Sequence, residues 1–226
     1  MTQYRIEGGH PLRGTIKASG NKNAALPCIA ACLLSEEPVT LRNIPEIEDV
    51  LVMLDICKAL GAKVERVDKN AWRIDASSLE SSEIPASLSA KVRASILFAG
   101  PLLARLGNLS LPPPGGDVIG RRRLDTHFLA LEELGARIEI DGCFKFSANK
   151  LKGSDIFLDE ASVTATENAV MAAALAEGRT IIRNAASEPH VQDVCRLVSA
   201  MGAKVYGIGS NILTVDGTKK LHGADF

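Results

Sequence analysis

Apolar residues along the 226-residue chain gather in stretches of two kinds, and the first kind is apolar on almost every side. Helices without a polar face are typical of protein interiors. Three Ala-rich segments have this character, namely NAALPCIAACLL, VRASILFAGPLLARL and ATENAVMAAALAEG, which begin at residues 23, 92 and 165. A short run of strand-forming residues follows each one, VTLRNI, NLSL or RTIIRN. The pattern predicts three buried helices that each lead into a strand.

The second kind of stretch has one apolar face and precedes a pair of short β-rich runs. Its three examples are EDVLVMLDICKAL, LDTHFLALEEL and QDVCRLVSAM. An acid stands near the start of each predicted helix, where the helix dipole favours negative charge, namely Asp49, Asp125 and Asp193. A glycine that can close the helix in a left-handed conformation follows each, namely Gly61, Gly135 and Gly202. Hairpin turns are then expected at Lys69-Asn70, Asp141-Gly142 and Gly209-Ser210-Asn211.

These stretches form one repeating unit of buried helix, strand, loop, amphipathic helix and two strands. It recurs after about 70 residues, at roughly 21–80, 88–150 and 160–218. The alternative is a set of unrelated αβ units, but three occurrences of [LM]-G-A-[KR]-[VI] in matched contexts disfavour it. We therefore predict an α/β domain over residues 21–226, with three copies around one axis, apolar helices inside and sheets outside.

Composition narrows the classes of function. The net charge of −1 and the aromatic content of 4% argue against a nucleic-acid-binding protein, which usually needs a basic excess or stacking platforms. No apolar run approaches the ~20 residues of a membrane helix, and the N-terminus lacks an apolar signal core. We expect a cytoplasmic protein without a membrane partner. Its five cysteines are expected to be reduced and mostly in the core, namely Cys28, Cys32, Cys57, Cys143 and Cys195.

Cations stand at equivalent positions of the first two repeats. Lys22 and Asn23 belong to a Gly-Asn-Lys-Asn loop that enters the first apolar helix, and Arg93 opens the second. Free N–H groups at a helix start attract anions, and arginine can grip a phosphate or carboxylate through two hydrogen bonds. Asn23 is a candidate N-cap. The alternative at the first helix is ordinary capping beside a solvated lysine.

The segment PPPGGDVIGRRRLDTH, residues 112–127, surrounds one carboxylate with arginines. Its glycines at 115, 116 and 120 allow unusual backbone angles and close approach to a ligand. Asp117 is either a salt-bridge partner of a neighbouring arginine or a general acid or base.

Two further polar groups are candidates. Ser162, Thr164 and Thr166 stand at the start of the third buried helix, either facing a ligand or capping the helix. Glu188, His190 and Asp193 could form a polar cluster, although a lone histidine in a loop is more often solvated.

Taken together, SGNKNAALP, VRAS, PGGDVIG-R-R-RLD-H, LEELGA and SVTATEN resemble the enolpyruvyl transferases, and the matches run along the whole chain in order. The resemblance implies an inside-out α/β barrel built from three βαβαββ units. Members of the family have two such domains and about twice this length. Residues 1–20 would complete the second, missing C-terminal domain, which would begin at KKLHGADF.

The resemblance implies a reaction and two small-molecule substrates. The enolpyruvyl group of phosphoenolpyruvate would move to the 3-hydroxyl of UDP-N-acetylglucosamine with release of phosphate, as the first committed step of peptidoglycan synthesis. No metal or organic cofactor is expected. Two alternatives remain: a related transferase with another acceptor, and an inactive half-enzyme that only binds an anion or a nucleotide sugar.

The resemblance also implies roles for individual residues. Asp117 would be the proton donor, with Lys22 and Arg122 in the catalytic group and the general base in the missing half. Lys22, Arg93 and Arg122 would bind phosphoenolpyruvate. Asn23 would lie near the sugar hydroxyl, and Glu188 would belong to the polar network of the cleft. The uridine diphosphate would be contacted by Arg122, Leu124, Asp125, Thr126, His127, Ser162, Val163 and Thr164.

Four positions depart from the common pattern of the family. Asp117 stands where the best-known members have a cysteine, and since fosfomycin acts by alkylating that thiol, we expect insensitivity to it. Glu160 replaces a frequent lysine, Thr164 a frequent glycine and His190 a frequent acid.

Overall fold

A computed structural model of the chain describes residues 3–116 and 123–226. The first repeat contains α1 (Lys22–Ala31), the 3₁₀ helix η1 (Cys32–Leu34), β1 (Val39–Leu41), α2 (Glu48–Ala59), β2 (Lys63–Asp68) and β3 (Ala71–Asp75). The second contains α3 (Ala86–Ser89), η2 (Arg93–Phe98), α4 (Ala99–Leu106), β4 (Asn108–Leu111), α5 (Asp125–Glu133), β5 (Arg137–Asp141) and β6 (Cys143–Ser147). The third contains β7 (Asp155–Phe157), α6 (Val163–Ala173), β8 (Arg179–Arg183), α7 (Pro189–Ala200), β9 (Lys204–Tyr206) and β10 (Ile212–Asp216).

Each repeat has its own sheet, and the three sheets share one strand order. The second strand of the hairpin lies in the middle in β1-β3-β2, in β4-β6-β5 and in β8-β10-β9, and β7 adds a parallel strand beside β8. The other pairs in these sheets are antiparallel. The same connectivity in all three sheets confirms the predicted repeat.

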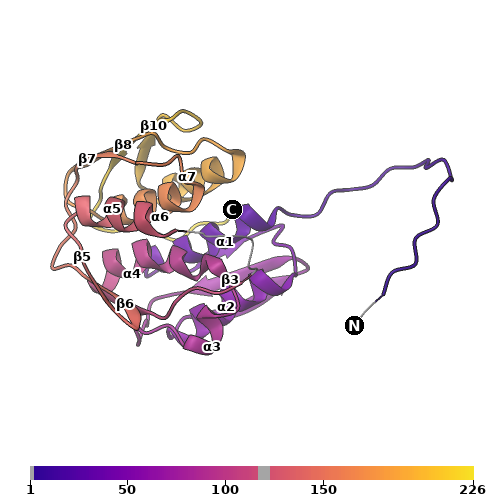
Figure 1. Ribbon diagram of the computed structural model, residues 1–226, viewed down its shortest axis with the longest axis horizontal. Coiled ribbons are helices and arrows are strands. Elements are labelled where there is room, and N and C mark those ends of the chain that lie inside the picture. The colour runs from indigo at the N-terminus through magenta and orange to yellow at the C-terminus, as the bar shows by residue number, and fades with distance from the viewer. Residues whose placement is uncertain (1–2, 117–122) are drawn as a thin grey trace.

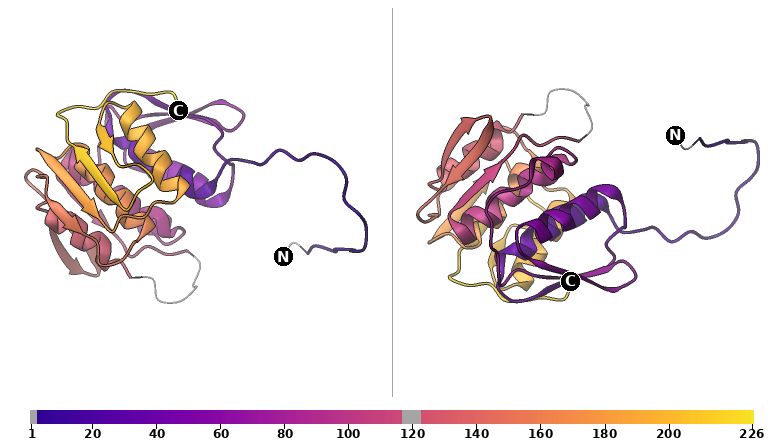
Figure 2. Two further views of the ribbon diagram at one scale, coloured as in Figure 1. Left: turned by 90° about the horizontal axis from the view of Figure 1, so that it is seen from above. Right: turned by 90° about the horizontal axis from the view of Figure 1, so that it is seen from below.

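The helices α1, α4 and α6 lie between the sheets, which form the outside of the molecule (Figures 1 and 2). Side chains from each of these helical runs are fully buried, among them Ile29, Phe98 and Met171. Helices that are apolar on all sides need such an interior, because no face of them suits water. The prediction of an inside-out α/β arrangement is confirmed.

The predicted helix ends and hairpin turns are confirmed. Gly61, Gly135 and Gly202 have φ values of 100°, 96° and 108°, so each closes its helix in the left-handed region. The hairpin turns fall where they were predicted, between β2 and β3, β5 and β6, and β9 and β10.

Two predictions about helices are wrong in detail. Asp193 does not lie in the first turn of its helix, since α7 begins at Pro189, a residue whose fixed φ suits the first helical position. The second buried helix opens with six residues of 3₁₀ helix, η2, before α4. Pro101, near the start of α4, lacks the N–H that a regular helix would donate at this position.

The C-terminal residues pack on the first repeat. Thr40 N and Arg42 N donate to the backbone oxygens of Ala224 and Phe226 at 2.8 and 2.7 Å, so residues 224–226 run parallel to β1. Arg42 also forms a double ion pair with Asp225. The segment KKLHGADF, expected to open a second domain, thus gives the first repeat the same kind of parallel partner that β7 gives the third.

Residues 3–19 follow an extended path with no helix or strand, and lead away from the body of the molecule (Figure 1). Their large apolar side chains are exposed: Tyr4, Ile6, Leu12 and Ile16. Within residues 3–116 and 123–226, none of the helices combines the length and hydropathy that a membrane crossing requires.

Candidate functional site

Three helix starts carry the predicted ligands. Lys22 is the first residue of α1, Arg93 the first of η2 and Val163 the first of α6. This confirms that Lys22 and Arg93 occupy equivalent positions in their repeats. The first N–H groups of a helix have no partner within it, so those that no side chain caps are donors that favour an anion.

The start of α1 is capped by Asn21, whose side-chain oxygen accepts hydrogen bonds from Asn23 N at 2.7 Å and Ala24 N at 3.3 Å. The prediction of Asn23 as the cap is therefore wrong by two residues, because the helix begins at Lys22. Asn23 is exposed, and the ammonium of Lys22 lies 2.8 Å from Asp49 at the start of α2. Both partners of this pair are partly solvated, so Lys22 can exchange Asp49 for a ligand at small cost.

Arg93 and the residues just before it hold both described flanks of the charged loop. Its guanidinium donates to the backbone oxygen of Arg123 at 3.1 Å. On the other flank, Gly115 N and Gly116 N donate to the backbone oxygens of Ser89 and Ala90 at 2.9 and 3.2 Å. The loop therefore leaves and returns beside Arg93.

The glycine pair of this loop is explained by crowding against the protein itself. A Cβ at Gly115 would lie 1.8 Å from the backbone oxygen of Ala90, and one at Gly116 would lie 3.1 Å from Arg93 N. Gly116 also has a φ of 88°. Close approach to residues 90–93 thus requires glycine at both positions. Asp117, Gly120, Arg121 and Arg122 lie outside the described residues.

The residues after the loop lead into α5, and their side chains are buried or make contacts within the protein. Leu124 is buried, and Asp125 is ion-paired with Arg123. The hydroxyl of Thr126 donates to Asp159 at 2.7 Å. The side chain of Thr126 is therefore held by the protein, which is consistent with the expected ligand contact through its backbone.

His127 joins α5 to α6 through a buried hydrogen-bond network. Its Nε2 lies 3.0 Å from Thr164 Oγ1, and its Nδ1 lies 2.9 Å from Asn168 Nδ2. Burial, and secondarily the charge of Arg93, lower the pKa of His127 to about 3. The imidazole is thus neutral at physiological pH, and Arg93, His127 and Thr164 belong to one region.

At the start of α6, three hydroxyls have different roles. Ser162 caps the helix by accepting from Ala165 N at 3.4 Å. Thr166 is turned inward, donating to Ser162 O at 2.8 Å and accepting from Ala186 N at 3.0 Å. Of the three candidates, Thr166 therefore supports the fold, whereas Thr164 remains half-exposed beside His127.

Around α7, the described contacts bring in a carboxyl that was not predicted, Glu167. Asp193 forms an ion pair with Arg196 at 3.0 Å. Glu188 is the exposed residue before α7, and its charge adds to burial in raising the pKa of Glu167 on α6 well above the usual range. Glu167 is 1% exposed, and its Oε1 has no hydrogen-bond partner in the described structure. A buried carboxyl whose pKa is raised thus lies within electrostatic reach of Glu188.

Glu167 and Asn168 were not among the residues predicted from sequence. Both are polar residues in a helix whose other members from Ala165 to Ala173 are buried. A carboxyl and an amide within a segment that is rich in alanine were the signal that could have identified them.

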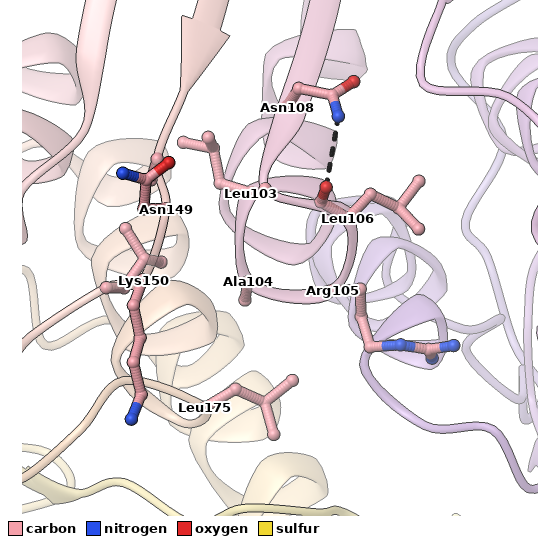
Figure 3. Close-up of a pocket in the computed structure, with 11 residues that line it drawn as sticks. Leu103, Ala104, Arg105, Leu106, Asn108, Asn149, Lys150 and Leu175 are labelled. Atoms are coloured by element: carbon pink, nitrogen blue, oxygen red, sulfur yellow. Dashed lines mark hydrogen bonds between the residues drawn. The ribbon is translucent and has the colours of Figure 1, made fainter.

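A pocket lies away from these helix starts, around the end of α4 (Figure 3). It has a volume of about 480 Å³ and is lined by Arg105, Asn108 and Lys150, among others. Arg105 donates there to Leu33 O at 2.9 Å and Ala76 O at 3.3 Å. The Arg105 guanidinium thus satisfies a carbonyl group of η1 and one that directly follows β3. Across the described ranges, no cluster of side chains suits a metal ion.

Three repeats around buried helices, with cations at two helix starts, define a domain of the enolpyruvyl transferase type. Residues 6–226 match the family described as EPSP synthase (3-phosphoshikimate 1-carboxyvinyltransferase), and the chain belongs to this family.

Curated relatives match the chain from end to end. It is 67% identical over 225 residues to a UDP-N-acetylglucosamine 1-carboxyvinyltransferase of Treponema denticola, and 63% identical over 226 residues to that of Treponema pallidum. Each match covers 100% of this chain and 53% of the relative. The chain thus spans about half the length of the curated relatives it matches.

Solved structures support the fold. The enolpyruvyl transferase NikO from Streptomyces tendae has a TM-score of 0.84 at 22% identity, over 97% of this chain and 52% of its own. EPSP synthase from Acinetobacter baumannii has a TM-score of 0.74 at 21% identity, over 94% of this chain and 48% of its own.

Proposed function

We propose that this chain is the substrate-binding N-terminal half of a UDP-N-acetylglucosamine 1-carboxyvinyltransferase of the cytoplasm. The observation that carries the proposal is the 67% identity, over the whole chain, to the Treponema denticola protein of that name. The cations at equivalent helix starts, Lys22 and Arg93, suit the anionic substrates that such a reaction needs.

The reaction would proceed by addition and elimination. A proton is added to the methylene carbon of phosphoenolpyruvate, and the 3-hydroxyl of UDP-N-acetylglucosamine attacks its C2. Loss of phosphate and of a proton then gives the enolpyruvyl ether. Negative charge is present on both substrates throughout, so fixed cations and backbone N–H groups stabilise the reacting complex.

Lys22 and Arg93 would hold the phosphate and carboxylate of phosphoenolpyruvate. Arg93 is suited to this role because it lies at a helix start and its guanidinium can form two parallel bonds to an oxyanion. Arg122 is proposed as a further ligand and Asp117 as the proton donor. These two roles rest on the sequence resemblance, since both residues lie outside the described part of the chain.

The nucleotide sugar would bind between the starts of α5 and α6. The start of α6 supplies the N–H groups of its first turn and the hydroxyl of Thr164 for the diphosphate. Leu124, Asp125, Thr126 and His127 would contact the uridine diphosphate from the side of α5, mainly through their backbone. Asn23 and Glu188 are proposed to face the sugar and the polar part of the cleft.

The rest of the enzyme would supply the other wall of the cleft and the general base. We propose that residues 1–20 complete that second domain, because four large apolar side chains of this arm are exposed here: Tyr4, Ile6, Leu12 and Ile16. An exposed apolar segment of this kind gains stability by adding to another sheet or core.

The decisive test is an acceptor screen on the full-length protein that contains this chain. Phosphate release from phosphoenolpyruvate is measured with UDP-N-acetylglucosamine and, separately, with 3-phosphoshikimate. Release with the nucleotide sugar alone supports the proposal. Release only with 3-phosphoshikimate, or with neither acceptor, would contradict it.

A further inference from the structure

The side-chain amide of Asn168 lies at the centre of the network between α4, α5 and α6. Its Oδ1 accepts from Gly100 N at 2.9 Å, and its Nδ2 donates to Ile96 O at 2.9 Å. The reverse orientation of the amide would set two donors against each other at Gly100 and two acceptors against each other at Ile96. Backbone groups of the second buried helix therefore define which atom of Asn168 is the nitrogen.

Gly100 makes this contact possible. A Cβ at position 100 would lie 2.6 Å from the backbone oxygen of Asn168 and 3.1 Å from its Oδ1. The two helices can approach this closely only with glycine at the contact. The orientation of the amide is thus built into the packing of α4 against α6.

The orientation of Asn168 assigns the tautomer of His127. One hydrogen of Nδ2 is used by Ile96 O, and the other points to His127 Nδ1 at 2.9 Å. Because a donor faces it, Nδ1 must be the unprotonated nitrogen, and in a neutral imidazole the hydrogen is then on Nε2. His127 is 3% exposed, so water does not offer an alternative partner.

The tautomer of His127 in turn decides what Thr164 can offer to a ligand. Nε2–H donates to Thr164 Oγ1 at 3.0 Å, so the hydroxyl hydrogen of Thr164 points elsewhere. Within the described ranges that hydrogen has no acceptor, in contrast to Thr166, whose hydroxyl donates to Ser162 O at 2.8 Å. With the other tautomer, Thr164 would donate to His127 and present only lone pairs to the ligand.

We propose that Asn168 is a positioning residue: it holds His127 in the Nε2–H form, so that Thr164 must donate its hydroxyl hydrogen to an oxygen of the nucleotide diphosphate. The proposal rests on the proposed function for the identity of the ligand. Phosphate oxygens only accept hydrogen bonds. The Thr164 hydroxyl, which already accepts from His127, therefore has a hydrogen to donate to a phosphate oxygen. Asn168 acts through His127 and Thr164 and touches no substrate.

The tautomer is tested by ¹⁵N NMR of the full-length protein labelled at histidine, with His127→Gln to assign the signals. We expect one neutral ring from about pH 5 to 8, with its hydrogen on Nε2 and an unprotonated Nδ1. A hydrogen on Nδ1 would overturn the proposal. This measurement requires no turnover, so it decides the network even if the proposed function fails.

The hydroxyl is tested by the steady-state kinetics of Thr164→Val and Thr164→Ser. Loss of a hydrogen bond to a charged group should raise the KM for UDP-N-acetylglucosamine on the order of ten-fold in the valine variant. The KM for phosphoenolpyruvate should be unchanged, and serine should restore most of the affinity. Thr214→Val, on β10 in the sheet of the third repeat, is the matched control. An unchanged KM for the nucleotide sugar in Thr164→Val, or an equal rise in both KM values, would overturn the proposal.

Asn168→Asp tests the positioning step itself, since a carboxylate cannot donate to His127. We expect the hydrogen of the imidazole to move to Nδ1, and the KM for the nucleotide sugar to rise as in Thr164→Val. If this variant fails to fold, the NMR of the unaltered protein and the two Thr164 variants still decide. A folded Asn168→Asp protein with Nε2–H and an unchanged KM would overturn the role of Asn168.

Discussion

Arg93 and Arg123 are joined by a hydrogen bond of 3.1 Å, from the guanidinium of the first to the backbone oxygen of the second. Gly116, at the other flank of the charged loop, packs on the backbone of the same Arg93. One side chain at a helix start therefore holds the return of the loop, and the same side chain is a proposed ligand of phosphoenolpyruvate.

This dual position makes Arg93 sensitive to substitution. Arg93→Ala should raise the KM for phosphoenolpyruvate at least about ten-fold, because a charged hydrogen bond to the substrate is lost. Arg93→Lys should be intermediate, since lysine cannot form the two parallel bonds of a guanidinium. Steady-state kinetics of the full-length protein measure both, with the exposed Arg73→Ala on β3 as control. A KM for phosphoenolpyruvate that is the same in all three variants would rule out this role.

Fosfomycin should not inactivate the full-length protein. The expectation rests on the sequence, because a carboxylate at Asp117 is a poorer nucleophile toward the epoxide than a thiolate. Asp117→Cys should create time-dependent inactivation, with an adduct on this residue detected by mass spectrometry. Irreversible inactivation of the unaltered protein, with an adduct on the loop, would show the expectation to be wrong.

His127 should make the stability of the fold depend on pH in acid. Its pKa is about 3 in the folded protein against an ordinary value of 6.5, so between these values only the unfolded chain binds the proton. The free energy of unfolding should therefore fall as the pH is lowered from 6.5 toward 3, by up to about 1.4 kcal/mol per pH unit from this group. The free energy of unfolding, measured with urea at several pH values, should depend less on pH in His127→Gln. In His10→Gln, on the exposed arm, the pH dependence should be unchanged.

Glu167 should act in the opposite direction. Its pKa is raised above the ordinary value of 4.5, so above that pH the unfolded chain loses a proton that the folded protein keeps. The contribution of Glu167 is complete below pH 4.5 and is lost as the pH rises through the folded pKa. Relative to the unaltered protein, Glu167→Gln should thus become more stable as the pH rises. Parallel unfolding curves for the two proteins at all pH values would contradict this reading.

The free energy of unfolding of two variants can show whether Asn21 or Asn23 caps α1. Asn21→Ala removes the acceptor for two N–H groups of α1 and should lower the free energy of unfolding by about 1 kcal/mol. Asn23→Ala, two residues on, should change it by much less, because its exposed side chain does not cap the helix. Chemical denaturation of both variants makes the comparison, and equal losses would refute the assignment of the cap.

Much of the architecture could be predicted because its signals are local. Glycines 61, 135 and 202 each close a helix by their own backbone freedom, and the hairpin turns depend on a few neighbouring residues. The repetition of these signals predicted the three units. Three helices have no polar face, and this predicted that these helices lie inside the domain. The start of the third amphipathic helix was predicted too late, because an acid such as Asp193 is typical of a first turn. The helix begins at Pro189, four residues earlier.

By itself, the sequence determined the repeat, the family and the equivalence of Lys22 with Arg93, since all three depend on order and spacing along the chain. Only the tertiary structure decided which polar side chains form hydrogen bonds within the protein. Thr164 and Thr166 are two residues apart on one helix, but the first meets His127 from α5 while the second bonds within its own turn and to Ala186. Hydrogen bonds between distant segments depend on how helices pack, and the roles of Asn168 and Gly100 follow from such a contact between α4 and α6.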